Sequence, residues 1–415
     1  HISRHIDAHN LLSKHQHGFV QRKSCQTNLI ETFEDWTKIM DEGHNLDIIF
    51  LDYKKAFDTV PHRRLLLKLH GYGIRKNVLL WIQDFLSHRF QQVVVGNSSS
   101  TWGEVSSGVP QGSVLGPTLF TLYVNELPTL IRSHLKMFAD DTKLYRSLVD
   151  DTDSQILQAD LKTLDDWSDK WLLKFNAEKC TVMHCGSSNK NIEYTMAAEG
   201  GQGHTLKTTK LEKDLGVYVS CNLKPTTHCL KAANKAMVAL KLLNLAFDRL
   251  NLYNFNKLYT TYVRPHLDYC IQAVGPYMRQ DFVALEKVQR RATKLVKGLK
   301  HLSYQDRLRR LKLSSIEERV ARGDLIETYK ILSGKVSLDP ANFFLEAQNT
   351  RTRGHRAKLI KKQVAHKART NFFSIRVVTP WNSLPEEVVS ARTTNEFKSK
   401  LDRYRATRAR SSQIH

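Results

Sequence analysis

The sequence predicts an α+β fold that is divided into more than one unit. Its 415 residues exceed what one hydrophobic core supports, which indicates about two to four units. Strand-like segments lie mainly before residue 220, and long helical patterns follow residue 225. Hydrophobic residues make up 41% and charged residues 25% of the chain, an ordinary globular composition. No window of about 18 apolar residues occurs, so no membrane-spanning helix is expected.

Hydrophobic spacing predicts the first elements in chain order. Apolar side chains at helical spacing predict a helix over 26–42, and the short β-branched run 46–51 predicts a buried strand. Pro61 suits the first turn of another helix, and a further helix spans 77–87. The segment 91–105 predicts a hairpin, because two strand-like runs flank Gly-Asn-Ser-Ser-Ser.

The middle of the chain contains a loop and a second hairpin. Residues 106–117 hold three glycines and two prolines, which predicts a shaped loop that leads into a helix over 118–127. The apolar stretches 136–139 and 142–145 predict a hairpin with two aspartates at its tip. An amphipathic helix over 153–171 follows. Later helices are predicted over 226–248, 254–263, 280–299 and 315–333.

Positive charge is confined to the second half of the chain. Residues 1–220 carry 25 Lys and Arg against 26 Asp and Glu, whereas residues 221–415 carry 38 against 15. Such an excess indicates a polyanionic partner. An anionic membrane surface would attract the same charge, but we find no lipidation signal.

One part of the basic half has two interpretations. No acid occurs between Glu346 and Glu386, while residues 351–376 hold nine Lys and Arg. A solvated surface or disordered tail explains this composition. A nucleic-acid contact explains it as well, with Phe372, Phe373 and Trp381 stacking on bases.

The six cysteines form no metal-binding or disulfide pattern. No C-x-x-C pair occurs, and the histidines near cysteines (His184, His228 and His266) lack the spacing of a zinc site. We therefore expect a reducing compartment and no zinc. The chain starts at His1 without a signal sequence, so we interpret it as a fragment of something longer.

Three aspartates are candidates for a metal site. Asp52 ends the predicted buried strand, and Asp140 and Asp141 occupy the predicted hairpin tip. Carboxylates brought together repel each other unless a divalent cation such as Mg²⁺ or Mn²⁺ neutralises them. Two ions about 4 Å apart would support an in-line phosphoryl transfer. The Asp-Asp pair alone is weakly specific, because two further Asp-Asp pairs, at 150–151 and 165–166, suit solvated helix and loop positions.

Successive sequence blocks resemble the reverse transcriptases of non-LTR retrotransposons, the LINE-type elements close to the jockey-like group. Six blocks occur in the family's order, and two later stretches are also similar. They are, along the chain, His17–Cys25, Phe50–Pro61, Gly108–Pro117, Phe138–Asp141, Asn176–Cys180 and Lys213–Val217, followed by Tyr262–Cys270 and Trp381–Pro385.

The resemblance implies a right-hand polymerase. Residues 1–220 would form a partial fingers subdomain and the palm with its antiparallel sheet, 221–300 a helical thumb or connection, and 301–415 a basic, nucleic-acid-binding region. The implied activity is RNA-directed DNA polymerase, a nucleotidyltransferase that extends a DNA 3′ end on an RNA template. Partners would be template RNA, primer or target DNA and deoxynucleoside triphosphates, with no membrane. We expect the nucleus and cytoplasm as its location.

The same resemblance implies a ligand set for two Mg²⁺ ions, with Mn²⁺ as an alternative. The carboxylates of Asp52, Asp140 and Asp141 and the backbone carbonyl of Tyr53 match the family's metal ligands. Asp58 is interpreted as a structural cap or turn acid. If this stretch is a strand, Asp58 and its neighbour Phe57 point to opposite faces, so Asp58 would point away from the site.

Nucleotide contacts are also implied. Phe57 matches the bulky residue that excludes a 2′-hydroxyl, although a plain core phenylalanine remains an alternative. Gln111 and Gly112 match residues at the incoming nucleotide, where glycine allows close backbone approach. Lys179 matches a lysine proposed to protonate pyrophosphate, with a solvated lysine as the alternative.

Two further pairs complete the implied set. Arg22 and Lys23 match cations of the fingers that grip the triphosphate, or else form a surface pair. Leu215 and Gly216 resemble the primer-grip turn.

Two other functions stay open. A catalytically inactive or domesticated remnant would bind nucleic acid with strong salt dependence and incorporate nothing; the family's fingers begin before His17, which favours this reading. A palm polymerase of another class, such as a group II intron protein or an RNA-templated RNA polymerase, would differ in its preference for ribonucleotides. Phe57 and Phe-Ala-Asp-Asp favour the LINE-type enzyme.

Overall fold

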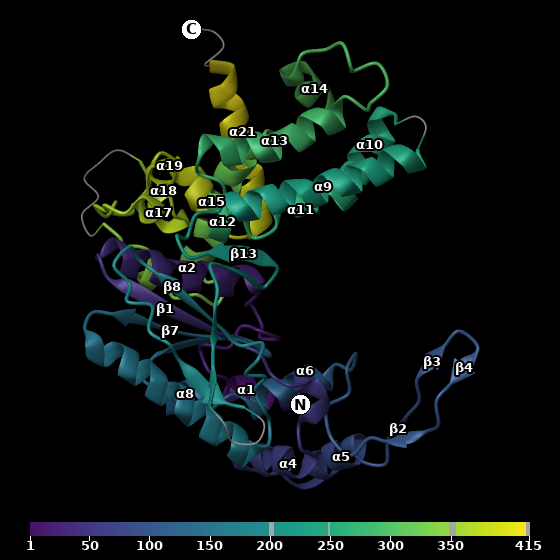
Figure 1. Ribbon diagram of the computed structural model, residues 1–415. Helices are drawn as coiled ribbons and strands as arrows, with labels where there is room; N and C mark the ends of the chain where they lie inside the picture. Colours follow the sequence, from purple (N-terminus) through teal and green to yellow (C-terminus); the bar gives the residue numbers. More distant parts are fainter. Residues whose placement is uncertain (199–202, 248–249, 348–353, 412–415) are drawn as a thin grey trace. The chain divides into compact units, whose positions relative to one another are not determined.

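A computed structural model describes residues 1–198, 203–247, 250–347 and 354–411. The chain forms two compact units (Figure 1). Unit 1 comprises His1–Asn28 and Gly43–Lys210, and unit 2 comprises Leu29–Glu42 and Leu211–His415. The predicted segments 221–300 and 301–415 both lie in unit 2, and their separate roles stay predictions. The predicted helix end at residue 248 lies outside the described residues.

Unit 1 is built on a five-stranded sheet with the strand order β11-β8-β1-β7-β6. Strand β1 lies in the centre and pairs antiparallel with both β7 and β8. The predicted strand 46–51 and the hairpin around residue 140 are therefore confirmed. The strands are β1 (Asn45–Leu51), β6 (His134–Phe138), β7 (Asp141–Leu148), β8 (Thr181–Cys185) and β11 (Lys207–Thr208).

Helices pack on this sheet and build the core of unit 1. The long helix α8 begins at a capping box of Asp150 and Asp153, which satisfies backbone donors at its first turn. Helix α8 runs along the sheet (Figure 1), and its apolar side chains share one buried cluster with those of β1 and β7. The described helices that lie within unit 1 are α1 (Ile2–Ala8), α3 (Ala56–Thr59), α4 (His62–Gly71), α5 (Lys76–Leu86), α6 (Leu115–Tyr123), α7 (Leu127–Leu130) and α8 (Asp151–Trp171).

The predicted hairpin over 91–105 is also present, as two short ladders. Strands β2 (Phe90–Gln91) and β5 (Gly103–Glu104) form its base, and β3 (Val94–Val95) and β4 (Ser98–Ser99) form its tip. A small ladder of β9 (Thr195–Ala197) and β10 (Gly203–Thr205) completes the strands of unit 1.

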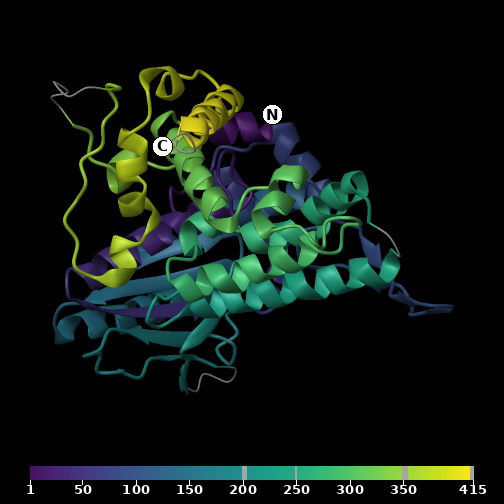
Figure 2. The same ribbon diagram turned by 90° about the horizontal axis from the view of Figure 1, so that it is seen from above.

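Unit 2 consists mainly of helices. Helix α2 (Cys25–Asp41) begins in unit 1, and its residues from Leu29 onward belong to unit 2. Helices α9 and α13 run side by side in both views (Figures 1 and 2), because small residues on α9, such as Ala232 and Ala236, allow close packing.

The remaining elements of unit 2 include a hairpin, β12 (Leu211–Asp214) and β13 (Val217–Ser220), and a π-helical turn over Tyr259–Val263. The helices are α9 (Thr226–Ala246), α10 (Leu252–Leu258), α11 (Arg264–Asp268), α12 (Ile271–Val274), α13 (Arg279–Thr293), α14 (Tyr304–Leu311), α15 (Ile316–Leu332), α16 (Pro340–Phe343), α17 (Lys367–Thr370), α18 (Phe373–Arg376), α19 (Val378–Asn382), α20 (Glu386–Val389) and α21 (Thr394–Ser411).

The aromatic residues of the basic segment have a structural role. Phe372, Phe373 and Trp381 are buried in unit 2 at 4%, 0% and 1% exposure. The prediction that they stack on nucleic-acid bases is therefore wrong, because they fill the core around the short helices α17 to α19. Sequence reasoning could not separate the two roles, since aromatic side chains serve both.

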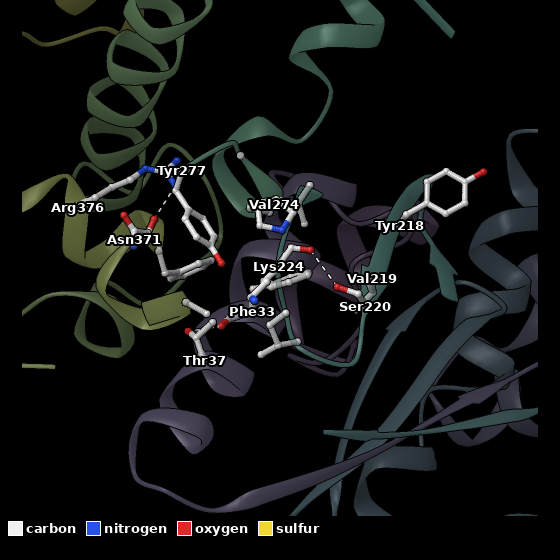
Figure 3. Close-up of a pocket in the computed structure, with 16 residues that line it drawn as sticks. Phe33, Thr37, Tyr218, Val219, Ser220, Lys224, Val274, Tyr277, Asn371 and Arg376 are labelled. Atoms are coloured by element: carbon white, nitrogen blue, oxygen red, sulfur yellow. Dashed lines mark hydrogen bonds between the residues drawn. The ribbon is translucent and has the colours of Figure 1, made fainter. Parts of the chain in front are cut away.

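Part of the basic segment is neutralised internally. The Arg369 guanidinium forms a buried ion pair with Glu34 of α2, and Ser374 donates a hydrogen bond of 2.6 Å to the same carboxylate. Arg376 donates two hydrogen bonds to Asp324, and it lines a small pocket with Phe33 of α2 (Figure 3). Some cations of this segment therefore stabilise unit 2 through internal ion pairs, and they are not all available to solvent or to a ligand.

None of the described helices combines the length and the mean hydropathy that crossing a membrane requires.

Candidate active site

Asp52 leaves the central strand of unit 1 at a defined position. The last residue of β1, Leu51, pairs with Thr142 of β7, so Asp52 follows at the edge where the β6–β7 hairpin turns. Its backbone is held from another segment as well. The Asn176 N–H donates a 2.7 Å hydrogen bond to the Asp52 carbonyl, and the Asp52 N–H lies 3.3 Å from the Cys180 sulfur.

Cys180 is a positioning residue that the sequence analysis missed. Its thiol contacts both the N–H and the carbonyl of Asp52 across 128 residues of sequence. Burial raises the Cys180 pKa to about 12, so the thiol stays neutral. The Asn176–Cys180 motif signalled this segment, but a cysteine in a motif does not reveal that its partner is a backbone group.

Asp140 and Asp141 lie at the tip of the β6–β7 hairpin. Phe138 pairs with Asp141, which leaves Ala139 and Asp140 as the two turn residues. Ala139 has φ of 57°, in the left-handed region that costs energy for a residue with a Cβ. Something outside the hairpin therefore has to stabilise this turn.

Gln16 supplies that stabilisation, and it too was missed. Its buried side-chain oxygen Oε1 accepts hydrogen bonds from the N–H groups of Ala139 (2.9 Å) and Gly18 (2.7 Å). A Cβ on Gly18 would lie 2.4 Å from the Ala139 nitrogen, so only glycine fits there. The start of the block His17–Cys25 therefore packs against the turn that carries Asp140, and this contact explains why the block occurs together with the aspartates.

The carboxylates of Asp52 and Asp140 lie close enough for the charge of one to shift the pKa of the other. Burial raises the pKa of Asp140, the negative charge of Asp52 raises it further, and the N–H groups of Asp140 and Asp141 oppose this rise. Oxygen Oδ2 of Asp52 is buried and accepts no hydrogen bond within the described part of the chain. The ammonium nitrogen of Lys179 lies 3.7 Å from that oxygen.

This pair of carboxylates fits a divalent cation. Carboxylate oxygens are hard ligands, and a cation would neutralise the repulsion between Asp52 and Asp140 and bind the Asp52 Oδ2 atom, which accepts no hydrogen bond among the described residues. Asp141, the first residue of β7, has an exposed side chain. Across the described residues, no group of three His, Cys, Asp or Glu side chains is already arranged to hold a metal ion. The assignment of Asp141 and of the Tyr53 carbonyl as ligands stays a prediction.

Phe57 lies on the short helix α3, five residues after Asp52 in the sequence. It is half-buried, and its ring stacks on Phe120 with centroids 4.5 Å apart. The Gly/Pro loop contacts the same helix, because the Val109 N–H donates a 2.7 Å hydrogen bond to the Phe57 carbonyl. The structure thus brings Phe57 and the predicted nucleotide loop together.

Gln111 is held in place by Asp58. Its side-chain Nε2 donates a 2.8 Å hydrogen bond to Asp58 Oδ1. Gly108, with φ of 86°, packs so tightly that a Cβ would lie 2.6 Å from the Asp58 carbonyl oxygen, whereas a Cβ on Gly112 would meet nothing within 4 Å. The strand argument used for Asp58 was wrong, since residues 56–59 are helical, and its carboxylate is linked to the predicted nucleotide-contacting glutamine.

The remaining predicted contacts differ in their surroundings. The Lys23 ammonium donates to the backbone carbonyls of Lys14 and Gln16, which favours a structural role in the segment 14–23. Arg22 is exposed, with a left-handed φ of 60°. Their roles at the triphosphate stay predictions.

Leu215 and Gly216 form the turn between β12 and β13 in unit 2. Both have positive φ angles, 46° and 83°, and the Tyr269 hydroxyl donates a 2.8 Å hydrogen bond to the Leu215 carbonyl. The turn is therefore shaped and supported locally, and its role as a primer grip stays a prediction.

Comparison with known proteins decides the family. Residues 1–217 match the family described as reverse transcriptase (RNA-dependent DNA polymerase), which covers more than half of the chain. The chain belongs to the reverse transcriptase family. Because the match spans unit 1, the paired carboxylates lie within the part of the chain that defines this family.

Relatives of this chain are proteins of transposons and mobile elements, which confirms the resemblance to non-LTR elements. One is named "Probable RNA-directed DNA polymerase from transposon BS" of Drosophila melanogaster, 27% identical over 331 residues, which cover 75% of this chain and 36% of that protein. Another is the "RNA-directed DNA polymerase from mobile element jockey" of Drosophila funebris, 26% identical over 69% of this chain and 32% of that protein. The chain thus spans about a third of these curated relatives.

Solved structures of telomerase also show similarity. The telomerase of Candida albicans, in complex with a fragment of telomeric RNA, matches at 10% identity and a TM-score of 0.37, over 65% of this chain and 51% of that one.

Proposed function

We propose that this chain is the polymerase part of a non-LTR retrotransposon protein, and that it extends a DNA 3′ end on an RNA template by nucleotidyl transfer. The observation that carries the proposal is the convergence of Asp52 and Asp140: they are far apart in the sequence, yet Asp52 follows a strand paired with β7 and its charge raises the pKa of Asp140. The family and its transposon relatives support the same reaction. Nucleus and cytoplasm remain the proposed location.

The residues of unit 1 supply the groups that this reaction requires. Asp52 and Asp140, joined by Asp141 and the Tyr53 carbonyl, would hold two Mg²⁺ ions, which when bound acidify the primer hydroxyl and stabilise the pyrophosphate charge. The Lys179 ammonium, 3.7 Å from Asp52, would donate a proton to the leaving group.

Two further residues would select the substrate. The Phe57 ring, fixed against Phe120, would exclude a 2′-hydroxyl and so favour deoxynucleotides. Gln111, held by Asp58, would contact the incoming nucleotide. Positioning the two reactants accounts for the rest of the rate enhancement.

A primer-extension assay tests the proposal, with an RNA template, a DNA primer, deoxynucleotides and Mg²⁺. Asp140→Asn should lower the extension rate by at least about 10³-fold, because it removes a charge that the transition state requires, while template affinity stays within about twofold. Asp166→Asn is the matched control, since Asp166 is an exposed acid on α8.

Equal extension by Asp140→Asn and the wild-type chain would refute the site. A second candidate, a remnant that binds nucleic acid without catalysis, is favoured by the positive charge of residues 221–415. It predicts binding with no incorporation in Mg²⁺ or Mn²⁺ by any variant, the wild type included.

A further inference from the structure

The segment 14–18 extends the sheet of unit 1 beside the β6–β7 turn. Strand β6 lies at one edge of the five-stranded sheet, and Gln16 forms an isolated parallel bridge with Met137 of this strand. The His17 N–H donates a 2.9 Å hydrogen bond to the Met137 carbonyl, and the Met137 N–H donates one of 3.0 Å to the His15 carbonyl. The segment therefore has a fixed register against the strand that leads into the turn.

Contacts from outside the sheet hold the same segment. The Lys23 ammonium donates to the backbone carbonyls of Lys14 and Gln16. The Ser13 N–H, one residue before the segment, donates a 2.7 Å hydrogen bond to Asn125 Oδ1. Because the backbone is held from two directions, the fully buried side chain of Gln16 has little freedom to move away from the turn.

The turn depends on Gln16 because of its backbone angles. Ala139 has φ of 57° and is buried in the core cluster of unit 1, so this alanine adopts a conformation that only glycine adopts without strain. Oxygen Oε1 of Gln16 offsets the strain by accepting the Ala139 N–H at 2.9 Å. Asp140 follows directly, so rotation about the Ala139 backbone would move its carboxylate relative to that of Asp52.

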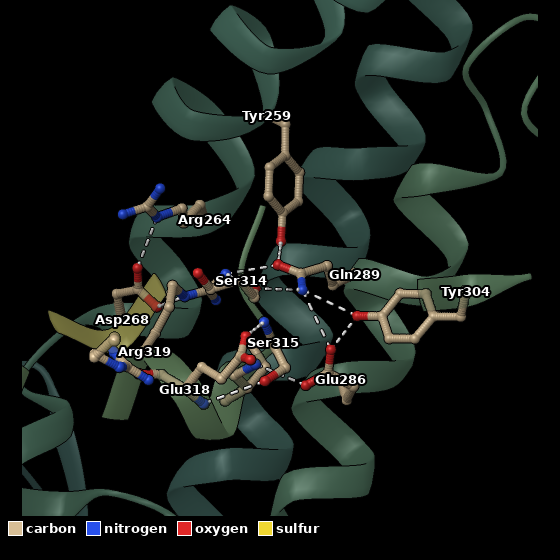
Figure 4. A network of polar contacts seen from close by, with 12 residues as sticks. Tyr259, Arg264, Asp268, Glu286, Gln289, Tyr304, Ser314, Ser315, Glu318 and Arg319 are labelled. Carbon is tan, nitrogen blue, oxygen red and sulfur yellow. Dashed lines mark hydrogen bonds and ion pairs between the residues drawn. The ribbon is translucent and has the colours of Figure 1, made fainter. Parts of the chain in front are cut away.

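Gln289 of α13, in unit 2, is a buried glutamine that uses both ends of its amide (Figure 4). Its Oε1 accepts hydrogen bonds from the Tyr259 hydroxyl at 2.8 Å and from Arg319 Nη1 at 2.6 Å, and its Nε2 donates one of 3.0 Å to the Tyr304 hydroxyl. These contacts join α13 to α14 and α15, so this glutamine stabilises the packing of helices.

Gln16 differs from Gln289, because only its oxygen forms hydrogen bonds. Oxygen Oε1 accepts the N–H groups of Ala139 and Gly18, whereas Nε2 is buried and makes no hydrogen bond to any residue that the structure describes. A buried donor without a partner costs folding free energy. Stability alone would therefore favour a different side chain at this position, and the contact with the turn indicates a role in placing Asp140.

Metal sites depend on the groups that orient their ligands as well as on the ligands themselves. We propose that Gln16 is a positioning residue, whose hydrogen bond to Ala139 sets the affinity of the Asp52–Asp140 pair for a divalent cation. The inference rests on the proposed polymerase function. It gives the segment 14–18 a part in metal binding, although none of its side chains is assigned as a ligand.

Binding of Mn²⁺ to the full chain, without nucleic acid or nucleotide, tests this inference, and the electron paramagnetic resonance signal of free Mn²⁺ measures it. Asp140→Asn defines the part of the binding that belongs to the site. Gln16→Met has a similar length but no acceptor, so it should raise the dissociation constant of that part by about 10- to 100-fold. In primer extension, the Mg²⁺ concentration for half-maximal rate should rise by a similar factor, while KM for deoxynucleotides at saturating Mg²⁺ changes by less than about threefold.

Gln158→Met is the matched control. Gln158 lies on α8 in unit 1, and its Oε1 also accepts a backbone N–H, that of Thr195 at 2.9 Å. Losing this contact should change the Mn²⁺ dissociation constant by less than about twofold, because Thr195 is not next to a proposed ligand.

A rescue experiment separates positioning from a general effect on folding. Ala139→Gly, added to Gln16→Met, should recover at least about threefold of the lost Mn²⁺ affinity, because glycine adopts a positive φ without strain. A purely structural role of Gln16 predicts no recovery. If Gln16→Met does not fold, as judged by its thermal unfolding, Gln16→Asn takes its place, since it keeps the amide but is too short to reach Ala139.

The outcomes distinguish this inference from the proposed function. Mn²⁺ binding that Asp140→Asn leaves unchanged would refute the proposed metal site itself. Binding that requires Asp140, yet has the same dissociation constant in the wild type and in the folded Gln16 variant, would overturn the inference and leave the proposed function standing. Weakening by Gln158→Met equal to that by the Gln16 variant would overturn it as well.

Discussion

At the residue scale, Lys68 shows how burial and aromatic contact act on one charge. Its ammonium nitrogen lies 4.0 to 5.0 Å from the ring centroids of Tyr123, Trp167 and Trp171, and it donates a 2.9 Å hydrogen bond to Glu126. Burial lowers its pKa from 10.5 to about 8, although Glu126 opposes the change. The charged form is thus less stable inside unit 1 than in water.

This shift predicts a pH dependence of stability. Between about pH 8 and pH 10.5 the unfolded chain binds a proton at Lys68 that the folded chain has released, so the unfolding free energy rises with pH. Lys68→Met should remove a rise of up to about 3 kcal/mol over this window. Urea unfolding at several pH values measures it, and identical pH slopes for both proteins would contradict the shift.

Phe57 carries the second prediction at this scale, which rests on the proposed polymerase. Phe57→Ala removes the ring that Phe120 fixes, so a 2′-hydroxyl would fit, and the preference for deoxynucleotides should fall by about 10- to 100-fold. Single-nucleotide incorporation with each sugar measures this ratio. Phe57→Tyr keeps the ring and serves as the control. An unchanged ratio in Phe57→Ala would favour the alternative of a plain core phenylalanine.

At the scale of elements, α2 and the C-terminal helices depend on one buried ion pair. Glu34 and Arg369 are 3% and 2% exposed, and the pair also contacts Thr37 and Ser374. Joining residues 335 positions apart, it connects the part of α2 in unit 2 to α17.

Arg369→Met should therefore lower the unfolding free energy by about 3 to 5 kcal/mol, because it leaves the Glu34 charge buried without its partner. The double variant Glu34→Gln with Arg369→Met should recover part of this loss. Denaturant unfolding measures both. A single variant as stable as the wild type would show that the pair contributes nothing.

Local patterns were sufficient for the long elements and insufficient for the short ones. The predicted helices over 26–42 and 153–171 occur as α2 and α8, because each carries an apolar stripe that one core covers. Helix α3 was not predicted, since four residues are too few for a period. Helices α14 and α17 to α21 were also missed. They contain many basic and polar residues and few buried ones, so their sequences show no clear apolar period, and the buried positions become apparent only in the assembled core of unit 2.

At the scale of the whole molecule, the charge imbalance affects stability as well as binding. The chain carries a net charge of +22, which destabilises the compact state through self-repulsion. Sodium chloride raised from about 50 to about 300 mM should screen this repulsion and raise the unfolding midpoint by roughly 2 °C or more. Scanning calorimetry measures the midpoint, and a non-ionic osmolyte controls for exclusion effects. A midpoint that falls with salt would show that attractive pairs dominate instead.

The sequence alone determined the family, the order of the blocks, the long helices and the paired carboxylates, because these depend on local periodicity and on residue types that particular chemistry requires. The tertiary structure decided which distant groups meet: Gln16 with the turn at Ala139, Cys180 with Asp52, and Asp58 with Gln111. It also decided that Phe372 and Trp381 are core residues and that Arg369 is buried. Such outcomes depend on contacts between residues far apart in the chain, and a local sequence pattern does not specify which distant residue a side chain contacts in the folded core.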